Sequence, residues 1–378
     1  MTRRIIPAVA AAAVLALGLS ACSGSADATT DGANASSVDA TTATSADAFG
    51  GFDQLVAAAE AEGELNVIAL PEDWANYGKI IDLFEQTYKI TVNSADPSVS
   101  SAEEIQAADN LKGQDTAPDV FDLGAAVALA ETAKFAPYKV QTWEDIPAEN
   151  KEETGLWVND YTGLMSVGYD AGVVKEPSQL ADLLTSDYAG KVALNGDPTQ
   201  AGAAAAGVQW AALQNGGTAD NIKPGIDFFA DLKKAGNFLP LDPTPSTIAS
   251  GETPVVIDWS FNNVAATAAN EGTIEWKTAI LPGAALGSYY NQAINLDAPH
   301  PAAARLWQEF IFSDEAQNLY LEAGAFPVRL NAMVEAKTVN QDVLDEVGEP
   351  PADLVQFTAK QTEGASTLLA SDWAAAVS

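Results

Sequence analysis

The sequence predicts an α/β protein with two lobes, and three observations lead to this fold class. The chain has 378 residues, enough for two lobes that each bury a core of their own. Hydrophobic residues make up 47% of it, which is typical of a globular protein. Short apolar runs alternate along the chain with stretches of helical periodicity, which is the βαβ pattern of a doubly wound sheet.

The first lobe is expected to begin with strands separated by helices. Apolar residues that follow one another without a helical period predict buried strands at 65–70, 90–92 and 119–123. Between the first two strands, Ile80, Ile81, Phe84 and Tyr88 have the spacing of one buried helix face. A second helix is expected to open at Ser100, because Ser-Ser-Ala-Glu-Glu is typical of a helix N-terminus.

The second lobe is expected to follow the same logic. It has predicted strands at 192–194 and 254–257 and an alanine-rich helix at 199–213, with Asp197 suited to the N-cap and Pro198 to the first turn. Crossing segments between the lobes are expected near 162–169 and 276–283. The predicted division is 52–165 plus 284–325 for lobe 1, 166–283 for lobe 2, and a C-terminal helical segment at 326–378 packed on the lobes.

The N-terminus indicates export. Arg3 and Arg4 precede a short apolar run at 5–19, which predicts a signal peptide over residues 1–21. The run ends in Leu-Ser-Ala-Cys, which resembles the lipobox of bacterial lipoproteins, where the cysteine, here Cys22, is lipidated. Residues 22–49 are mostly Ser, Thr, Ala, Asp and Gly, so a flexible tether is expected there. These features predict a protein anchored by lipid to the outer face of the cytoplasmic membrane, at the cell surface or in the periplasm.

Composition argues against several functions. The chain has 52 acidic and 18 basic residues and a net charge of −34, which argues against nucleic-acid binding. One cysteine excludes an internal disulfide framework and a multi-cysteine zinc site, and the one histidine, His300, stands between two prolines. Since no phosphate-binding, dinucleotide-binding or nucleophile-elbow motif is present, we expect no enzyme, no cofactor and no metal.

Three segments resemble the solute-binding proteins of bacterial ABC importers. They are the segments 65–92 (LNVIALPEDW…KITV), 117–124 (APDVFDLG) and 300–329 (HPAAARLWQEF…FPVR). The resemblance covers roughly residues 52–330 and is nearest to the spermidine/putrescine-type and iron(III)-type branches. It implies a type II periplasmic-binding-protein-like architecture, with a ligand cleft between the lobes that closes by hinge motion. It also implies a monomeric receptor that passes a small solute to the permease and ATPase subunits of an importer.

The candidate ligand-binding residues share one position, at or near the ends of predicted strands and the starts of predicted helices, where α/β lobes bind ligands. They are Asp73, Trp74, Tyr77, Ser101, Asp122, Asp197, Thr199, Asp258, Trp259, Tyr289, Tyr290 and Gln292. In polyamine-binding relatives, an aromatic plate and a carboxylate hold the ligand. Two acid–aromatic pairs, Asp73–Trp74 and Asp258–Trp259, therefore favour a polyamine or a similar organic cation.

Several candidates have structural alternatives. Ser101 and Asp197 are explained equally well by helix capping, and Asp122 by holding a neighbouring loop. Iron(III)-binding members use neighbouring tyrosines as ligands, so Tyr289 and Tyr290 keep iron(III) open, and a phosphonate is a further alternative. Adjacent strand residues point to opposite faces, however, which favours one tyrosine lining the cleft and the other packing.

Overall fold

The computed structural model describes residues 38–378 with the exception of residues 73, 98 and 351–353. The predicted signal peptide, Cys22 and the tether residues up to 37 lie outside the described residues. In the part of the chain that is described, no helix combines the length and the apolar character needed to cross a bilayer.

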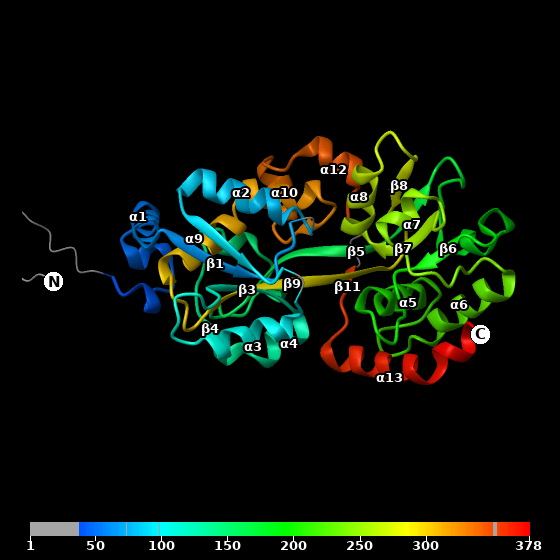
Figure 1. The fold of residues 1–378 in the computed structure, drawn as a ribbon, viewed down its shortest axis with the longest axis horizontal. Coiled ribbons are helices and arrows are strands. Elements are labelled where there is room, and N and C mark those ends of the chain that lie inside the picture. The colour runs from blue at the N-terminus through cyan, green and yellow to red at the C-terminus, as the bar shows by residue number, and fades with distance from the viewer. Residues whose placement is uncertain (1–37, 73, 98, 351–353) are drawn as a thin grey trace, which may run out of the picture. The chain divides into compact units, whose positions relative to one another are not determined.

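Lobe 1 is formed by the elements that pack around two neighbouring apolar clusters, with Leu65, Phe84 and Trp307 in one and Phe121 in the other, and around a smaller cluster that contains Phe326, Leu330 and Leu344. Its strands are β1 (Glu64–Ile68), β2 (Thr91–Ala95), β3 (Val120–Gly124), β4 (Phe135–Ala136) and β10 (Phe326–Pro327). Its helices are α1 (Phe52–Glu62), α2 (Tyr77–Tyr88), α3 (Ser101–Leu111), α4 (Ala125–Ala130), α9 (Pro301–Ile311), α10 (Asp314–Glu322), α11 (Leu330–Ala336) and α12 (Gln341–Val347) (Figure 1).

Lobe 2 surrounds a third cluster, in which Trp210, Phe229 and Ile257 are fully buried. Its strands are β6 (Val192–Leu194), β7 (Val255–Trp259) and β8 (Trp276–Ala279), and its helices are α5 (Gly202–Gln214), α6 (Lys223–Ala235), α7 (Pro245–Ala249), α8 (Ser260–Ala269) and α13 (Ala359–Ala376). Helix α5 is buried on nearly all sides, which fits its run of alanines and explains why it lacks a polar face.

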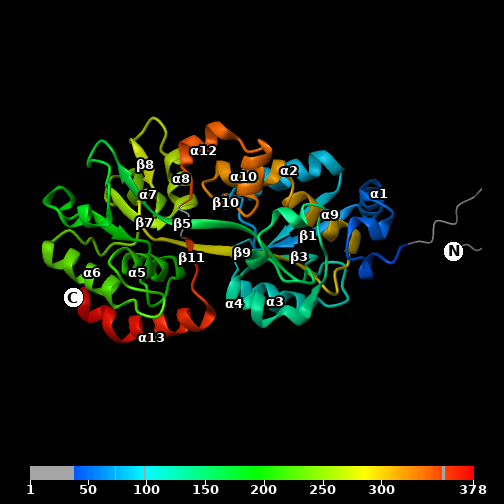
Figure 2. The ribbon, with the colours of Figure 1, turned by 180° about the vertical axis from the view of Figure 1, so that it is seen from behind.

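Two long strands, β5 (Val158–Asp170) and β9 (Ala285–Asn295), run through both lobes (Figure 2). Strand β5 pairs antiparallel with β9 as far as Leu164 and with β7 from Met165 onward. The partner of β5 thus changes between Leu164 and Met165, and the division at 165/166 stays a prediction. The second crossing lies later than predicted, because all of β8 pairs with the lobe 2 half of β5 and the chain crosses only as it enters β9.

The strand directions differ in part from a doubly wound sheet. Strands β1 and β2 are parallel, as are β6 and β7, but β3 is antiparallel to β9 and β5 is antiparallel to β7. A third segment also bridges the lobes: β11 (Leu354–Val355) pairs in parallel with the start of β9 and leads into α13. The result is one mixed sheet continuing through both lobes, beside the β1–β2 pair.

The prediction of a flexible tether over 22–49 is wrong for residues 38–49. Two short 3₁₀ helices, Ala40–Thr42 and Ala46–Phe49, occur there, and Ala43, Ala46 and Phe49 are buried. The buried Arg305 donates from Nε to Ala43 O at 2.6 Å and from Nη2 to Thr41 O at 2.9 Å. Small side chains let this segment pack closely, and its carbonyls supply the acceptors that a buried guanidinium needs.

Candidate functional site

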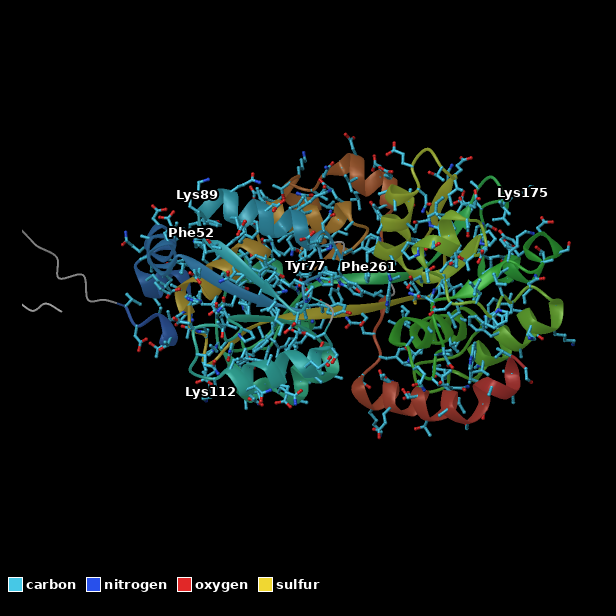
Figure 3. The ribbon with its side chains drawn as sticks, in the orientation of Figure 1. Phe52, Tyr77, Lys89, Lys112, Lys175 and Phe261 are labelled. Atoms are coloured by element: carbon cyan, nitrogen blue, oxygen red, sulfur yellow. The ribbon has the colours of Figure 1, made fainter. Side chains whose placement is uncertain are left out.

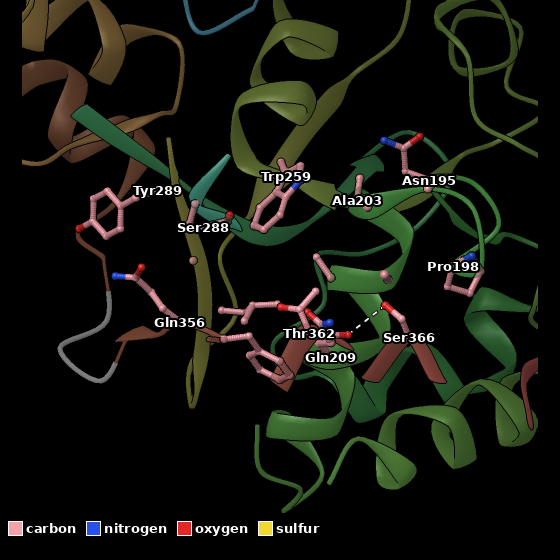
Figure 4. Close-up of a pocket in the computed structure, with 18 of the residues that line it drawn as sticks. Asn195, Pro198, Ala203, Gln209, Trp259, Ser288, Tyr289, Gln356, Thr362 and Ser366 are labelled. Atoms are coloured by element: carbon pink, nitrogen blue, oxygen red, sulfur yellow. Dashed lines mark hydrogen bonds between the residues drawn. The ribbon is translucent and has the colours of Figure 1, made fainter. Parts of the chain in front are cut away.

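A cavity of about 630 Å³ lies where lobe 1, lobe 2 and the crossing strands meet (Figure 4). Lobe 1 contributes Trp74 and Ala125 to its lining. Lobe 2 contributes residues from the β6–α5 loop, from α5, from the end of β7 and from the start of α8. Strand β9 contributes residues 286–290, and the C-terminal segment contributes Gln356, Phe357, Thr362 and Ser366. The polar and aromatic lining residues are Trp74, Asn195, Thr199, Gln200, Gln209, Trp259, Asn262, Ser288, Tyr289, Tyr290, Gln356, Phe357, Thr362 and Ser366.

The chemistry of this cavity is aromatic and neutral. Four large aromatic side chains that bear polar groups, two indoles and two phenols, alternate with amides and hydroxyls. None of the described lining residues carries a charge. Such a lining can stack on a solute and exchange hydrogen bonds with it, without a formal ion pair.

The two tryptophans are held by neighbouring aromatic rings. Trp74 Nε1 donates to Tyr161 Oη at 2.6 Å, and its ring centroid lies 4.9 Å from that of Phe261. The Trp259 ring stacks on Phe261, with a centroid distance of 6.4 Å and an interplanar angle of 14°. Phe261 therefore connects the lobe 1 tryptophan to the lobe 2 tryptophan, and their faces are positioned before any solute enters. Asp73, the other member of the first predicted pair, lies outside the described residues.

A second cavity of about 480 Å³ adjoins the first and shares Trp74, Asn195 and Asn262 with it. Asp258 lines this side cavity. Its Oδ1 accepts from the Trp259 N–H at 2.7 Å, and its Oδ2 accepts from Asn262 Nδ2 at 3.0 Å. Burial raises the pKa of Asp258 to about 6, although these hydrogen bonds act in the opposite direction.

Asp197 and Thr199 form a turn in place of the predicted helix start. Helix α5 begins at Gly202 with Ala201 as the N-cap, so the prediction of Asp197 as N-cap is wrong. The Asp197 Oδ1 atom instead accepts from Thr199 N and Oγ1, both at 2.8 Å, because a short acidic side chain readily closes a turn two residues on. Thr199 lines the main cavity, whereas Asp197 is exposed and lines a separate depression.

Tyr77, Asp122 and Gln292 are brought together, but behind the cavity, and line neither cavity. Tyr77 Oη donates to Asp122 Oδ2 at 2.8 Å, and Gln292 Nε2 donates to Asp160 Oδ2 at 2.9 Å. Burial raises the pKa of Asp160 to about 6, and burial with the nearby Asp160 charge raises the pKa of Asp122 well above its usual value. The structure thus gives these three candidates a role in a buried polar network.

This network reaches the cavity wall through aromatic rings. Figure 3 labels Tyr77 and Phe261, and the ring of Tyr161 contacts both, with centroid distances of 6.3 Å to Tyr77 and 6.4 Å to Phe261. Tyr161 also stacks on Tyr290 at 5.5 Å. The buried carboxylates therefore lie one aromatic layer behind the residues that face a solute.

Ser101 has a structural contact as well. Ser100 is the N-cap of α3, as predicted, with Glu103 completing a capping box. The Ser101 Oγ atom accepts from Gly124 N at 3.0 Å and so joins α3 to the end of β3. Ser101 does not line either cavity.

Both Tyr289 and Tyr290 line the main cavity, so the prediction that only one would do so is wrong. The register between β5 and β9 shifts between Asn159 and Thr162, opposite these residues. A bulge of this kind twists the paired strands locally and breaks the strict alternation of faces. Burial raises the pKa of Tyr289 to about 12 and raises that of Tyr290 further.

Several lining residues were not among the sequence-based candidates. Gln209 is only 6% exposed, and its polarity within an alanine-rich helix was a usable signal. Gln356, Phe357, Thr362 and Ser366 come from the C-terminal segment, where no local pattern points to a ligand.

The histidine has a structural partner. Its Nδ1 lies 2.9 Å from Asp119 Oδ2, and the His300 N–H donates to Asp119 Oδ1 at 2.7 Å. This hydrogen bond raises the pKa of His300. Among the described residues, no group of three or more His, Cys, Asp and Glu side chains is arranged to hold a metal ion.

Comparison with solved structures establishes the fold. PotD of Streptococcus pneumoniae, a spermidine/putrescine ABC transporter substrate-binding protein in complex with calcium and HEPES, is 12% identical with a TM-score of 0.62 over 83% of this chain and 99% of that one. AgtB of A. tumefaciens R10, in complex with agropinic acid, is 14% identical with a TM-score of 0.58 over 83% and 98%. Iron-bound HitA of Pseudomonas aeruginosa is 18% identical with a TM-score of 0.56 over 81% and 97%. At these identities the likeness shows the two-lobe binding-protein fold.

Sequence comparison identifies the family. A search of curated proteins gave no match. Residues 116–348, more than half of the chain, match the bacterial extracellular solute-binding proteins. The matched range contains both crossing strands and most of the cavity lining. The chain therefore belongs to the family of bacterial extracellular solute-binding proteins.

Proposed function

We propose that the chain is the solute receptor of an ABC importer, which captures a small solute and passes it unaltered to a membrane permease and its ATPase subunits. The observation that carries this proposal is the cavity of about 630 Å³ lined jointly by both lobes and by the strand that joins them. Because β5 and β9 connect the lobes, a bend in these strands changes the width of the cavity. A solute that contacts both lobes stabilises the closed form, which the permease can recognise.

The solute that we propose is a polyamine or a similar organic cation. The faces of Trp74 and Trp259 are suited to its methylene chain and to its positive charge. No cationic side chain stands among the described lining residues, and the chain carries a net charge of −34, which raises the local concentration of cations. Asp258, in the side cavity that Trp74 also lines, is the carboxylate that we assign to an ammonium group.

Calorimetry with putrescine and spermidine tests this assignment. The isosteric variant Asp258→Asn should lose ~2–5 kcal/mol of binding, because a buried ammonium would lose its counter-charge. That is a loss of ~30-fold or more in affinity. Asp197→Asn is the matched control and should bind as the parent does, since Asp197 is exposed and lies outside both cavities. An unchanged affinity in Asp258→Asn would remove Asp258 from the site, and no response to any amine would defeat the cation proposal.

Two observations favour other solutes, so the calorimetry should also include a phosphonate and iron(III). The N-terminus of α5 lacks a side-chain cap, and Ala201, Gly202 and Ala203 line the cavity, which favours an anion such as a phosphonate. Tyr289 and Tyr290 together favour iron(III), although their raised pKa values oppose formation of the phenolates that bind it. Iron(III) binding should give a visible phenolate charge-transfer band, whereas phosphonate binding should give heat without a band.

We further propose that the receptor is a monomer held at the outer face of the membrane by lipid on Cys22. The lipobox-like residues carry this part of the proposal.

A further inference from the structure

The C-terminal segment from Leu354 to Ala376, here called the strap, extends beyond the residues that match the family. It is attached at two places. Strand β11 pairs with Ala285 and Leu286 of β9, at the crossing between the lobes. Helix α13 packs on lobe 2 through Ala365, Leu369 and Trp373, and the Trp373 ring lies 5.3 Å from that of Phe229.

The first attachment leaves no room for a larger residue in β9. A Cβ atom at Gly287 would lie 2.7 Å from Leu354 Cδ1 and 2.7 Å from Thr162 Oγ1. The strap therefore lies directly against the crossing strand, and its position is set by that strand and by lobe 2.

Between these attachments the strap forms a wall of the main cavity (Figure 4). Gln356, Phe357, Thr362 and Ser366 all line it. Thr362 and Ser366 are one helical turn apart, so they share a face that adjoins the buried stripe of Ala365 and Leu369. Ser366 Oγ donates to Thr362 O at 2.9 Å, which leaves the lone pairs of its hydroxyl free to accept.

Gln209 of α5 lines the same cavity (Figure 4). Only 6% of the residue is exposed, its side chain makes no hydrogen bond with any of the described residues, and its amide atoms are not fully enclosed, so they are open to the cavity. An amide that opens only onto a cavity can exchange hydrogen bonds with a ligand that supplies both a donor and an acceptor.

We propose that Gln209, Thr362 and Ser366 form a subsite for an uncharged hydrogen-bonding group of the solute, an amide or a hydroxyl. A carboxamide and two hydroxyls offer both donors and acceptors without a net charge, which matches a group of the same kind. Phe357 supplies an apolar face beside it. This inference rests on the proposed role as a solute receptor and narrows the solute to an amine that also bears an amide or hydroxyl, such as an N-acylated or hydroxylated amine.

Calorimetry of the full chain with four probes tests the subsite: putrescine, N-acetylputrescine, aminobutanol and the uncharged polyol myo-inositol. We expect N-acetylputrescine or aminobutanol to bind at least ~10-fold more tightly than putrescine, because putrescine has no uncharged hydrogen-bonding group to place beside Gln209 and Thr362. Gln209→Leu and Thr362→Val should remove this preference, so that all amines bind with similar affinity. Thr362 is exposed to the cavity, so Thr362→Val preserves the fold if the buried Gln209→Leu variant does not.

Thr367→Val is the matched control, because Thr367 is exposed on the same helix, outside the cavity, and its hydroxyl donates to Glu363 O of its own helix. Equal binding of putrescine, N-acetylputrescine and aminobutanol overturns the subsite and leaves an amine receptor intact. Binding of myo-inositol alone, lost in Thr362→Val, supports the subsite and overturns the amine part of the proposed function. If none of the probes that bear an amide or hydroxyl binds, the subsite is wrong.

Discussion

Glu104, which contacts Asp122 of the buried polar network, tests whether burial keeps a carboxyl protonated in the folded protein. It lies on α3 with only 1% of its surface exposed, and its Oε2 accepts from the Asp122 N–H at 3.2 Å. Burial raises the pKa of the Glu104 carboxyl from 4.5 to about 9, although hydrogen bonds to Asp122 and Ser101 act in the opposite direction. The folded protein therefore holds a proton on Glu104 at neutral pH, where the unfolded chain has released it.

This difference makes the free energy of unfolding depend on pH. The folded pKa lies above the unfolded one, so the stabilisation is complete below pH 4.5 and is lost as pH rises towards 9. Each pH unit in that window lowers the free energy of unfolding by about 1.4 kcal/mol for one such group. Between pH 5 and pH 8 the loss from Glu104 alone is roughly 4 kcal/mol.

The perturbation is Glu104→Gln, which keeps the shape and the acceptor of the protonated carboxyl but does not titrate. Urea denaturation at constant ionic strength, at pH 5, 6, 7 and 8, measures the free energy of unfolding of parent and variant. The two should be similar at pH 5, and the variant should become the more stable by up to roughly 4 kcal/mol at pH 8.

Glu103→Gln is the matched control on the same helix. Glu103 is exposed and its carboxylate accepts from Ser100 N and Oγ, which lowers its pKa, so this variant should gain no stability at high pH. The reasoning fails if Glu104→Gln loses stability in step with the parent between pH 5 and pH 8, because Glu104 would then be ionised in the folded protein.

Three further predictions concern other parts of the chain. Gly225→Ala should lower the free energy of unfolding in urea by ~2 kcal/mol or more, because the new Cβ atom would clash with a backbone oxygen of α5. The control Gly364→Ala on α13 should be neutral or stabilising by up to ~1 kcal/mol, because its Cβ atom would meet no atom within 4 Å. Arg305→Met should make residues 38–49 sensitive to limited proteolysis, because the Ala43 carbonyl loses its donor; unchanged cleavage would show that apolar packing alone holds this segment. Cys22→Ala should move the protein from the membrane fraction to the soluble fraction or leave unprocessed precursor, and fractionation and migration like the parent would argue against lipidation.

The local elements were predictable because short-range patterns determine them. Strands β1, β3, β6 and β7 lie close to their predicted positions, since runs of buried apolar residues carry their own signal. The capping box at Ser100 also predicted the start of α3. The start of α5 was misplaced, because Asp197 can cap a helix or close a turn, and sequence alone does not distinguish these uses.

The candidate site was predicted in part. Trp74, Trp259, Tyr289 and Tyr290 line the main cavity, because aromatic residues near strand ends in a two-lobe protein tend to face the cleft. Tyr77 and Gln292 were chosen on the same reasoning, but they lie one layer behind it with Asp160. A position near the end of a strand does not show how far a side chain lies from the cavity, because that distance depends on which other elements pack over the strand end.

The sequence alone therefore determined the α/β class, the two lobes, the resemblance to solute-binding proteins and the acidic character of the chain. Each of these depends on composition or on patterns within about thirty residues. Only the tertiary structure decided that β9 carries two tyrosines into one cavity, that Asp258 lies in a side cavity, and that the strap from Leu354 onward lines the main cavity together with Gln209. The two cavities bring together residues that are more than a hundred positions apart, such as Trp74 and Asp258 or Gln209 and Thr362. Such contacts arise from the packing of whole elements, which no local pattern encodes.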